Sequence, residues 1–141
     1  MENYDALKLG NQICFPLYAA SRKIVQKYTP FLKELDLTYT QYIVMMVLWE
    51  ETEIGIGELG KKLYLDSGTL SPLLKSMEAK ELLMRKRDKT DERNVHIVIS
   101  EKGEKLKEKA IQVPTKMASC VHLAKDEAML LYKLLYEILQ D

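Results

Sequence analysis

Two cysteines, Cys14 and Cys120, carry the most reactive side chains of this 141-residue sequence. A thiolate is a nucleophile and a target for peroxides, but a lone cysteine on an apolar helix is more often an inert core residue. There is no CxxC motif, and His96 and His122 are distant in sequence from each other and from both cysteines. We therefore expect no structural metal and no cofactor. Redox chemistry at the thiols is to be weighed against plain packing.

Residues 65–100 form the segment around which the rest of the chain is organised. Apolar side chains recur there at positions i, i+3, i+4 and i+7, which predicts an amphipathic helix with one buried stripe. The stripe consists of Leu70, Leu73, Leu74 and Met77. The opposite face is small and polar, with Ser76 at its border. We expect the helix to begin at Asp66 or Ser67, although Pro72 makes a later start conceivable.

Short elements flank this helix on both sides. Residues 57–64 predict a short helix, which a tight turn joins to the next one. Residues 82–87 and 95–99 suit two strands separated by a wholly polar turn. Two short helices followed by a hairpin form a winged helix-turn-helix. In that motif the second helix enters the major groove of DNA, and the hairpin, or wing, reaches the adjacent backbone or minor groove.

The apolar spacing near the start of the chain predicts a long first helix, from about Asp5 to Tyr28. Gly10 and Pro16 interrupt it and can kink it, and Pro30 is expected to mark its end. This helix would precede the DNA-binding unit in the chain.

A second helix is signalled by Thr38 with Gln41 three residues on, which is a capping-box pattern. The residues that follow, 42–49, are nearly all apolar. We therefore expect this helix to be buried on all sides and to form the centre of the core.

The end of the chain predicts two more helices. Ser100 can cap a helix that ends before Pro114, and a last helix spans about Asp126 to Leu139. Its broad apolar stripe consists of Leu130, Leu131, Leu134, Leu135, Ile138 and Leu139. A helix this apolar needs a partner, but the pattern does not say whether that partner lies in the same chain.

The composition is ordinary for one soluble domain, with 47% apolar and 30% charged residues. There is no secretory segment and no apolar run of about 18 residues, so we expect a cytoplasmic protein that does not span a membrane. The net charge is zero, yet residues 1–60 carry −3, residues 61–93 carry +3 and residues 94–141 carry 0. Phosphate contacts need local positive charge. A solvated charged surface explains this excess equally well.

The stretch from Tyr64 to Met77, with the wing sequence Asp91-Glu92-Arg93, resembles the MarR family of bacterial transcription regulators. Within it, nearly the whole chain resembles the organic hydroperoxide regulators, OhrR, notably in NQICFPLYAASR (residues 11–22) and LTYTQYIVMMVLWE (residues 37–50). The resemblance implies a mainly α fold with a small β-hairpin wing.

The same resemblance divides the single MarR-like chain of residues 1–141. Helices in residues 1–36 and 101–141 would form a homodimer, and residues 37–100 would form the winged helix-turn-helix lobe. A two-fold dimer places its recognition helices roughly 34 Å apart, which implies an inverted-repeat site on double-stranded DNA.

By this resemblance Cys14 matches the peroxide-sensing cysteine. Tyr28 and Tyr39 match tyrosines that hydrogen-bond its thiolate from the other subunit, and Tyr18 matches a further tyrosine near the pocket. Hydroxyl donors and a helix dipole favour a charged sulfur, which can attack the O–O bond of an organic hydroperoxide to give an alcohol and a sulfenic acid. From composition alone, the eight tyrosines are half-buried packing residues.

Cys120 lies about where two-cysteine members of the OhrR group carry a resolving cysteine. The resemblance therefore implies an intersubunit Cys14–Cys120 disulfide after oxidation. One-cysteine members recruit an external thiol instead. Because the sequence ASCVHL is not distinctive, a buried and unreactive Cys120 is the alternative.

For DNA binding we expect contacts from the polar face of the second helix and from the wing. The residues are Ser67, Gly68, Thr69, Ser71, Lys75, Arg85, Arg87, Asp91 and Arg93. Hydroxyls can bond to bases or phosphates, Lys75 can bond to a phosphate or a guanine, and Gly68 permits close approach. By resemblance, Arg93 enters the minor groove and a salt bridge from Asp91 orients it, whereas the same pair could simply stabilise a solvated turn.

Together these features predict a repressor that releases its operator when an organic hydroperoxide oxidises Cys14. Two other functions stay open. One is a MarR-type regulator that a noncovalent ligand releases at the dimer cleft, with both cysteines structural. The other is a thiol peroxidase, but an enzyme would have no need of the wing, so we do not expect enzymatic activity.

Overall fold

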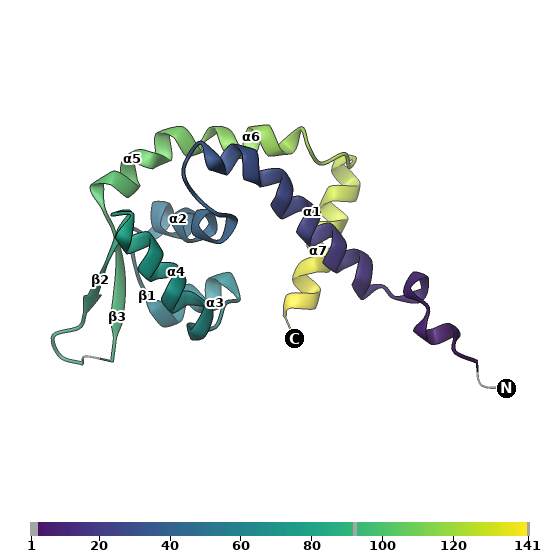
Figure 1. Ribbon diagram of the computed structural model, residues 1–141, viewed down its shortest axis with the longest axis horizontal. Helices are drawn as coiled ribbons and strands as arrows, with labels where there is room; N and C mark the ends of the chain where they lie inside the picture. The colour runs from purple at the N-terminus through teal and green to yellow at the C-terminus, as the bar shows by residue number, and fades with distance from the viewer. Residues whose placement is uncertain (1–2, 92, 141) are drawn as a thin grey trace.

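The computed structural model describes residues 3–91 and 93–140 as mainly helix with one small antiparallel sheet. Figure 1 shows one crowded end, formed by α2, α3, α4 and the sheet, from which α1, α5 and α6 lead away toward α7. The elements are η1 (Asp5–Leu7), η2 (Leu9–Asn11), α1 (Cys14–Lys33), α2 (Tyr39–Glu51), β1 (Glu53–Gly55), α3 (Ile56–Leu63), α4 (Ser67–Ala79), β2 (Leu83–Arg87), β3 (Val95–Ile99), α5 (Glu101–Ala110), α6 (Gln112–Ala118) and α7 (Lys125–Leu139). This architecture confirms the winged helix-turn-helix.

Helix α1 differs from its prediction at both ends. It begins at Cys14 rather than Asp5, because two separate 3-10 turns precede it. Pro16 lies in its first turn, where no intrahelical N–H is needed. The helix also continues through Pro30 to Lys33. The hydrogen bond that Pro30 cannot donate would go to the carbonyl of Gln26, and both residues are exposed, so water can satisfy that carbonyl.

Helix α2 begins as the sequence predicts. The Thr38 side chain accepts a hydrogen bond from the Gln41 backbone N–H at 3.3 Å, and the Gln41 side chain accepts one from the Thr38 N–H at 3.1 Å. Val44 and Leu48 are fully buried and lie at the centre of the core. The expectation of burial on all sides is wrong at Met46, which is 46% exposed because nothing in the described chain covers that side of the helix.

The sheet contains one strand more than the predicted hairpin. Strands β2 and β3 pair antiparallel with Leu83 opposite Ile99, which confirms the wing. Strand β1 adds to the other edge of β3, so the strand order is β1-β3-β2. Three residues are too few to show an alternating pattern, but burial of Ile54 ties this edge to the core.

The helix that follows the wing is shorter than expected. Ser100 caps α5 by accepting a hydrogen bond from the Gly103 N–H at 3.0 Å, as predicted. The helix ends at Ala110 rather than just before Pro114, and Pro114 instead lies in the first turn of α6. A proline in a first helical turn costs no hydrogen bond, so it starts a helix here rather than ending one.

Gly103 lies where α5 passes closest to the sheet. A methyl group there would collide with the backbone oxygen of Leu82 and would lie 3.0 Å from the Ile99 side chain. We expect Gly103→Ala to lower the free energy of unfolding by about 1–3 kcal/mol, measured by urea denaturation. Gly57→Ala in α3 is the matched control, since nothing lies within 4 Å of that position. Equal stability of the two variants would contradict the close packing.

The last helix, α7, matches the predicted segment but buries none of its residues in the described chain. Its large apolar side chains are at least 43% exposed, apart from Leu135, which is half-buried. The exposed set is Met129, Leu130, Leu131, Tyr132, Leu134, Tyr136, Ile138 and Leu139. The first turns of α1 are similarly uncovered at Ile13, Phe15 and Leu17. Among the described residues, no helix is long and apolar enough to cross a membrane.

Candidate functional site

Helix α4 is fixed by a cap at one end and by its apolar stripe along the side. It begins at Ser67, and the Asp66 carboxylate accepts a hydrogen bond from the Thr69 N–H at 2.7 Å, which confirms the earlier start. That hydrogen bond is the main reason why the pKa of Asp66 lies below its ordinary value. Leu70, Leu74 and Met77 are buried beneath the helix. The opposite side is therefore held outward.

The predicted DNA-reading face of α4 is open to solvent. Ser67, Gly68, Thr69, Ser71 and Lys75 are all exposed, and hydroxyls, a small residue and one cation share this surface. Such a surface can approach a groove closely and can bond to bases and phosphates.

Ser76 does not belong to this face. Its hydroxyl donates to the Leu73 carbonyl at 2.7 Å and accepts from the side-chain amide of Gln41 at 3.1 Å, so it is turned toward the protein.

Arg85 is held at the base of the wing. Its guanidinium lies 3.1 Å from the Glu78 carboxylate, which also accepts a hydrogen bond from the Arg85 N–H at 3.0 Å. The Arg85 side chain is the main reason why the pKa of Glu78 is lowered. Arg87, at the far end of β2, is exposed. A phosphate contact by Arg85 would have to compete with Glu78, whereas Arg87 lies on the outer part of the wing.

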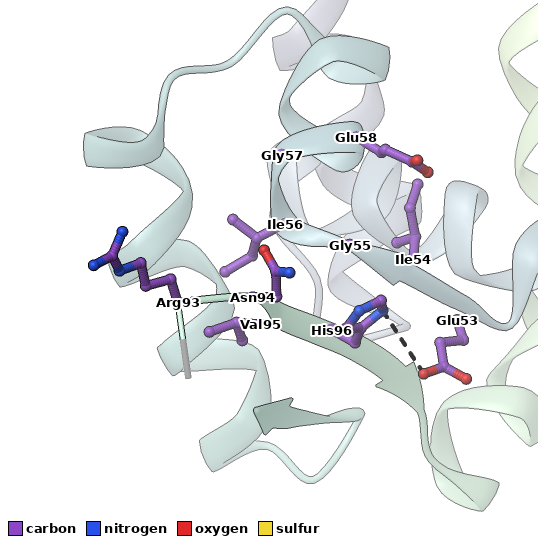
Figure 2. A pocket seen from close by; sticks show the side chains of 10 residues that line it. All are labelled: Glu53, Ile54, Gly55, Ile56, Gly57, Glu58, Arg93, Asn94, Val95 and His96. Carbon is purple, nitrogen blue, oxygen red and sulfur yellow. Dashed lines mark ion pairs between the residues drawn. The ribbon is translucent and has the colours of Figure 1, made fainter. Parts of the chain in front are cut away.

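The wing turn gives Asp91 a role different from the predicted salt bridge. Its carboxylate accepts a hydrogen bond from the backbone N–H of Arg93 at 3.0 Å, and none of the ion pairs among the described residues joins the two side chains. In a turn this tight the backbone N–H is the nearer donor. Glu92, between them, lies outside the described residues. Figure 2 shows the Arg93 side chain pointing away from His96 and Glu53.

A cavity of about 460 Å³ opens beside the wing turn, between the first residues of β3 and the segment of β1 and α3 from Glu53 to Glu58. Figure 2 shows Asn94 and His96 on the side of β3, and Glu53 beyond His96. The His96 ring and the Glu53 carboxylate lie 3.9 Å apart. Within residues 3–91 and 93–140, no group of three or more His, Cys, Asp or Glu side chains is placed to hold a metal ion.

Cys14 is the first residue of α1, and it is an exposed free thiol. Tyr18 lies one turn further along, with the Arg22 guanidinium 5.6 Å from the centre of its ring. The start of α1 is thus uncovered in the single chain.

The other two predicted sensing tyrosines lie at the opposite end of α1. The rings of Tyr28 and Tyr39 are 4.9 Å apart, and Tyr42 joins them at 5.8 Å from Tyr28. Burial is the main cause of the raised pKa values of all three hydroxyls. Tyr28 lies about 21 Å from Cys14 along the helix axis, at 1.5 Å per residue. One chain therefore does not bring Cys14 and these tyrosines together.

Cys120 lies at the tyrosine end of α1. It is a free, half-buried cysteine just after α6, and its backbone oxygen accepts a hydrogen bond from the Lys27 ammonium at 2.7 Å. Lys27 is the neighbour of Tyr28 in α1. Within one chain, Cys120 thus lies within reach of the Lys27 side chain, and Lys27 is about 20 Å from Cys14 along the helix axis at 1.5 Å per residue.

Sequence reasoning missed the inner polar contacts of α4. Gln41 is the one buried polar side chain among the described residues, and Lys80 donates to it from the end of α4 at 3.1 Å. The available signal was a glutamine beside a long apolar run, which we interpreted only as a helix cap.

Lys75 provides a direct test of the open face of α4. We expect Lys75→Ala to weaken DNA binding about tenfold at low salt and to reduce the slope of log affinity against log salt by about one, because one phosphate contact is lost. The measurement is fluorescence anisotropy over a salt series. Lys105→Ala on α5, where the lysine pairs with Glu101, is the matched control. Equal affinities for the two variants would remove Lys75 from the interface.

Comparison with known proteins identifies the fold and the class. Residues 26–110 match the family model described as transcriptional regulator SarA/Rot. The chain is 43% identical to the organic hydroperoxide resistance transcriptional regulator of Bacillus subtilis over 141 residues, which are 99% of this chain and 96% of that protein. It is 42% identical to the regulator SarZ of Staphylococcus aureus, over 85% of this chain and 81% of that protein.

A solved structure agrees with these relatives. The structure of reduced AbfR bound to DNA, a protein of Staphylococcus epidermidis, superposes with a TM-score of 0.80. The two chains are 33% identical, over 96% of this chain and 95% of that one.

The fold, the open face of α4 and these relatives define a winged-helix DNA-binding transcriptional regulator, not an enzyme. The chain belongs to the MarR family, and it is similar to the OhrR and SarA/Rot regulators within that group.

Proposed function

We propose that this protein is a homodimeric repressor that senses organic hydroperoxides through Cys14 and releases its operator when that thiol is oxidised. The relative from Bacillus subtilis is named for organic hydroperoxide resistance. Solved structures of AbfR are described as reduced and as disulfide-formed. These names support a redox function in this chain's own cysteines.

The uncovered helices support the homodimer. The apolar side chains of α7 and of the start of α1 are exposed in the single chain, and leaving so much apolar surface in water is unfavourable. A second copy of the chain would cover both. Residues 1–36 and 101–141 would then form the dimer, and residues 37–100 would bind an inverted repeat in double-stranded DNA.

The observation that carries the proposal is the separation of Cys14 from Tyr28 and Tyr39 by about 21 Å of helix. The hydroxyls of Tyr28 and Tyr39 would then meet the Cys14 sulfur only between subunits, with Cys14 of one chain and these two tyrosines of the other. Oxidation at such a site changes a contact across the dimer. It can therefore shift the two DNA-binding lobes relative to each other.

The proposed reaction is a two-electron oxidation of the Cys14 thiolate by an organic hydroperoxide. The Cys14 thiolate attacks one oxygen of the hydroperoxide, the O–O bond breaks, and the alkoxide leaves and takes up a proton to become the alcohol. The sulfur is oxidised by two electrons to a sulfenic acid, and the peroxide is reduced. The sulfenic acid can then condense with Cys120 of the other subunit, or with an external thiol, and release water.

The test is fluorescence anisotropy of the reduced protein on DNA from its own upstream region, repeated after one equivalent of cumene hydroperoxide. We expect tight binding, release on oxidation, and recovery of binding with a thiol reductant. Tight binding that peroxide does not change would contradict the proposal.

A cavity of about 370 Å³ favours a second candidate function, a regulator released by a noncovalent ligand. It lies between α1 and the start of α2, and its lining includes Val25, Lys33, Tyr39 and Lys80. Asp36 also lines this cavity and lies 3.7 Å from the Lys80 ammonium, so Lys33 beside the apolar walls is the cation that suits a small aromatic or aliphatic carboxylate. Under this alternative both cysteines are structural, and Cys14→Ser would leave the response to the ligand intact.

A further inference from the structure

Gln41 is a buried side chain whose polar contacts join the start of α2 to the end of α4. Its side-chain oxygen accepts from the Thr38 N–H and from the Lys80 ammonium, both at 3.1 Å. Its amide nitrogen donates to the Ser76 hydroxyl at 3.1 Å. The Gln41 side chain thus contacts Thr38 at the start of α2, Ser76 in the last turn of α4, and Lys80, the residue that caps the C-terminus of α4.

Lys80 extends this contact to the end of α1. Its ammonium donates to the backbone oxygen of Asp36 at 2.6 Å, in the turn between α1 and α2. Lys80 is also the C-cap residue of α4, and its backbone oxygen accepts from Lys102 in α5 at 2.9 Å. The position of α4 along the α1–α2 turn is therefore set by polar contacts as well as by the apolar stripe.

One of the two sensing tyrosines, Tyr39, lies in the same helical turn as Gln41. Tyr39 is the first residue of α2, with Thr38 as its N-cap and Gln41 as its third residue. The Tyr39 ring packs on Tyr28 of α1. Because Tyr39 and Gln41 share the first turn of α2, a shift of that turn with the Tyr39 ring would also move the Gln41 side chain relative to Ser76 and Lys80.

We propose that Gln41 is the positioning residue through which a displacement of Tyr28 and Tyr39 reaches the recognition helix α4. When the tyrosine pair shifts, the Gln41 amide no longer meets its partners on α4, and the polar face of α4 loses its alignment with DNA. This inference rests on the proposed function, because it explains how oxidation at Cys14 would reach the DNA-binding face.

Burial makes this contact sensitive to small shifts. Gln41 is 5% exposed, so its own amide group has little access to water when a hydrogen bond is lost, whereas its partners Ser76 and Lys80 reach solvent. The proposed coupling requires that this contact is made in one state of the protein and broken in the other. An exposed polar contact would be replaced by water and would carry little of the signal.

The test compares the affinities of reduced and oxidised protein for the same DNA in four variants. Gln41→Met keeps length and apolar contact but loses all three hydrogen bonds, and Ser76→Ala removes one partner from the side of α4. Gln41→Glu keeps an acceptor for Lys80 and is the conservative rescue. Gln112→Met, at the exposed start of α6, is the matched control.

We expect Gln41→Met to lower the DNA affinity of the reduced protein about tenfold. The DNA affinity of the oxidised protein should not change, since the Gln41 contact is already broken in that state. The ratio of the two affinities then falls by the same factor. Ser76→Ala should show a smaller effect of the same kind, and Gln41→Glu should recover part of the ratio.

Equal weakening in both redox states would overturn the inference, because it would show a purely structural role. Unchanged affinity in a folded Gln41→Met protein would overturn it as well, with circular dichroism as the check on folding. If oxidation does not change the DNA affinity of the wild-type protein, the proposed function itself is contradicted, and the role of Gln41 that depends on it is contradicted as well. If oxidation lowers the DNA affinity of the wild-type protein, and Gln41→Met shows the same ratio of reduced to oxidised affinity, the proposed function stands and only the role of Gln41 is contradicted.

Discussion

We expect the Cys14→Ser protein to keep its full affinity for operator DNA after cumene hydroperoxide, while the wild-type protein loses two to three orders of magnitude. That loss corresponds to about 3–4 kcal/mol of binding free energy. Serine is close to cysteine in size, and Cys14 is exposed, so the substitution leaves the fold intact. Its hydroxyl does not form a sulfenic acid, so the oxidant has no sulfur to act on at this position.

Cys120→Ser is the companion variant in the same anisotropy assay. If Cys120 resolves the sulfenic acid, wild type forms a crosslinked dimer on a non-reducing gel and Cys120→Ser does not. A slow, thiol-dependent release in Cys120→Ser, with no crosslink in wild type, would favour the external-thiol route instead. Release of the Cys14→Ser protein by peroxide would contradict a sensing role for Cys14.

The second large effect concerns the dimer. Leu131 and Leu134 of α7 are each 45% exposed in the single chain, so the fold of one chain does not depend on them. In a homodimer they would be buried, and carboxylates in their place would be buried without partners. We expect the double substitution Leu131→Glu with Leu134→Glu to give a folded monomer that binds operator DNA more than about 100-fold more weakly, since its two half-site contacts are no longer linked.

Sedimentation equilibrium measures the assembly, and anisotropy measures the affinity. Lys133→Glu is the matched control, because it changes the net charge by the same amount at a side chain that is 72% exposed and paired with Glu137. The control should remain dimeric. A dimer in the double variant would place the interface elsewhere.

Local signals in the sequence predicted most elements of the fold. The capping box of Thr38 and Gln41 and the caps at Asp66 and Ser100 depend on near neighbours, and the structure confirms them. The prolines were misjudged, because their cost depends on their place in a helix. Pro30 does not end α1, because it is exposed and water can satisfy the carbonyl that loses its hydrogen bond there.

The sequence predicted the candidate site only for residues whose exposure depends on a single helix. The outward residues of α4 follow from its apolar stripe, as Lys75 shows. Arg85 is held by Glu78, and Ser76 is held by Gln41, through contacts between elements that the helical wheel does not contain. The carboxylate of Asp91 bonds to the backbone rather than to a guanidinium. The contacts of Arg85 and Ser76 come from packing between segments, whereas the Asp91 contact comes from the geometry of the wing turn.

Helix α1 carries Cys14 at one end and Tyr28 at the other. In the proposed dimer each copy of α1 therefore belongs to both sensing sites, as the thiol donor of one and the tyrosine donor of the other. The two sites share their supports, and damage to one thiol alters a helix that the second site also uses. The unit that responds to oxidant would then be the dimer rather than the single thiol. The amount of oxidant needed for release would depend on how many Cys14 thiols are oxidised in each dimer.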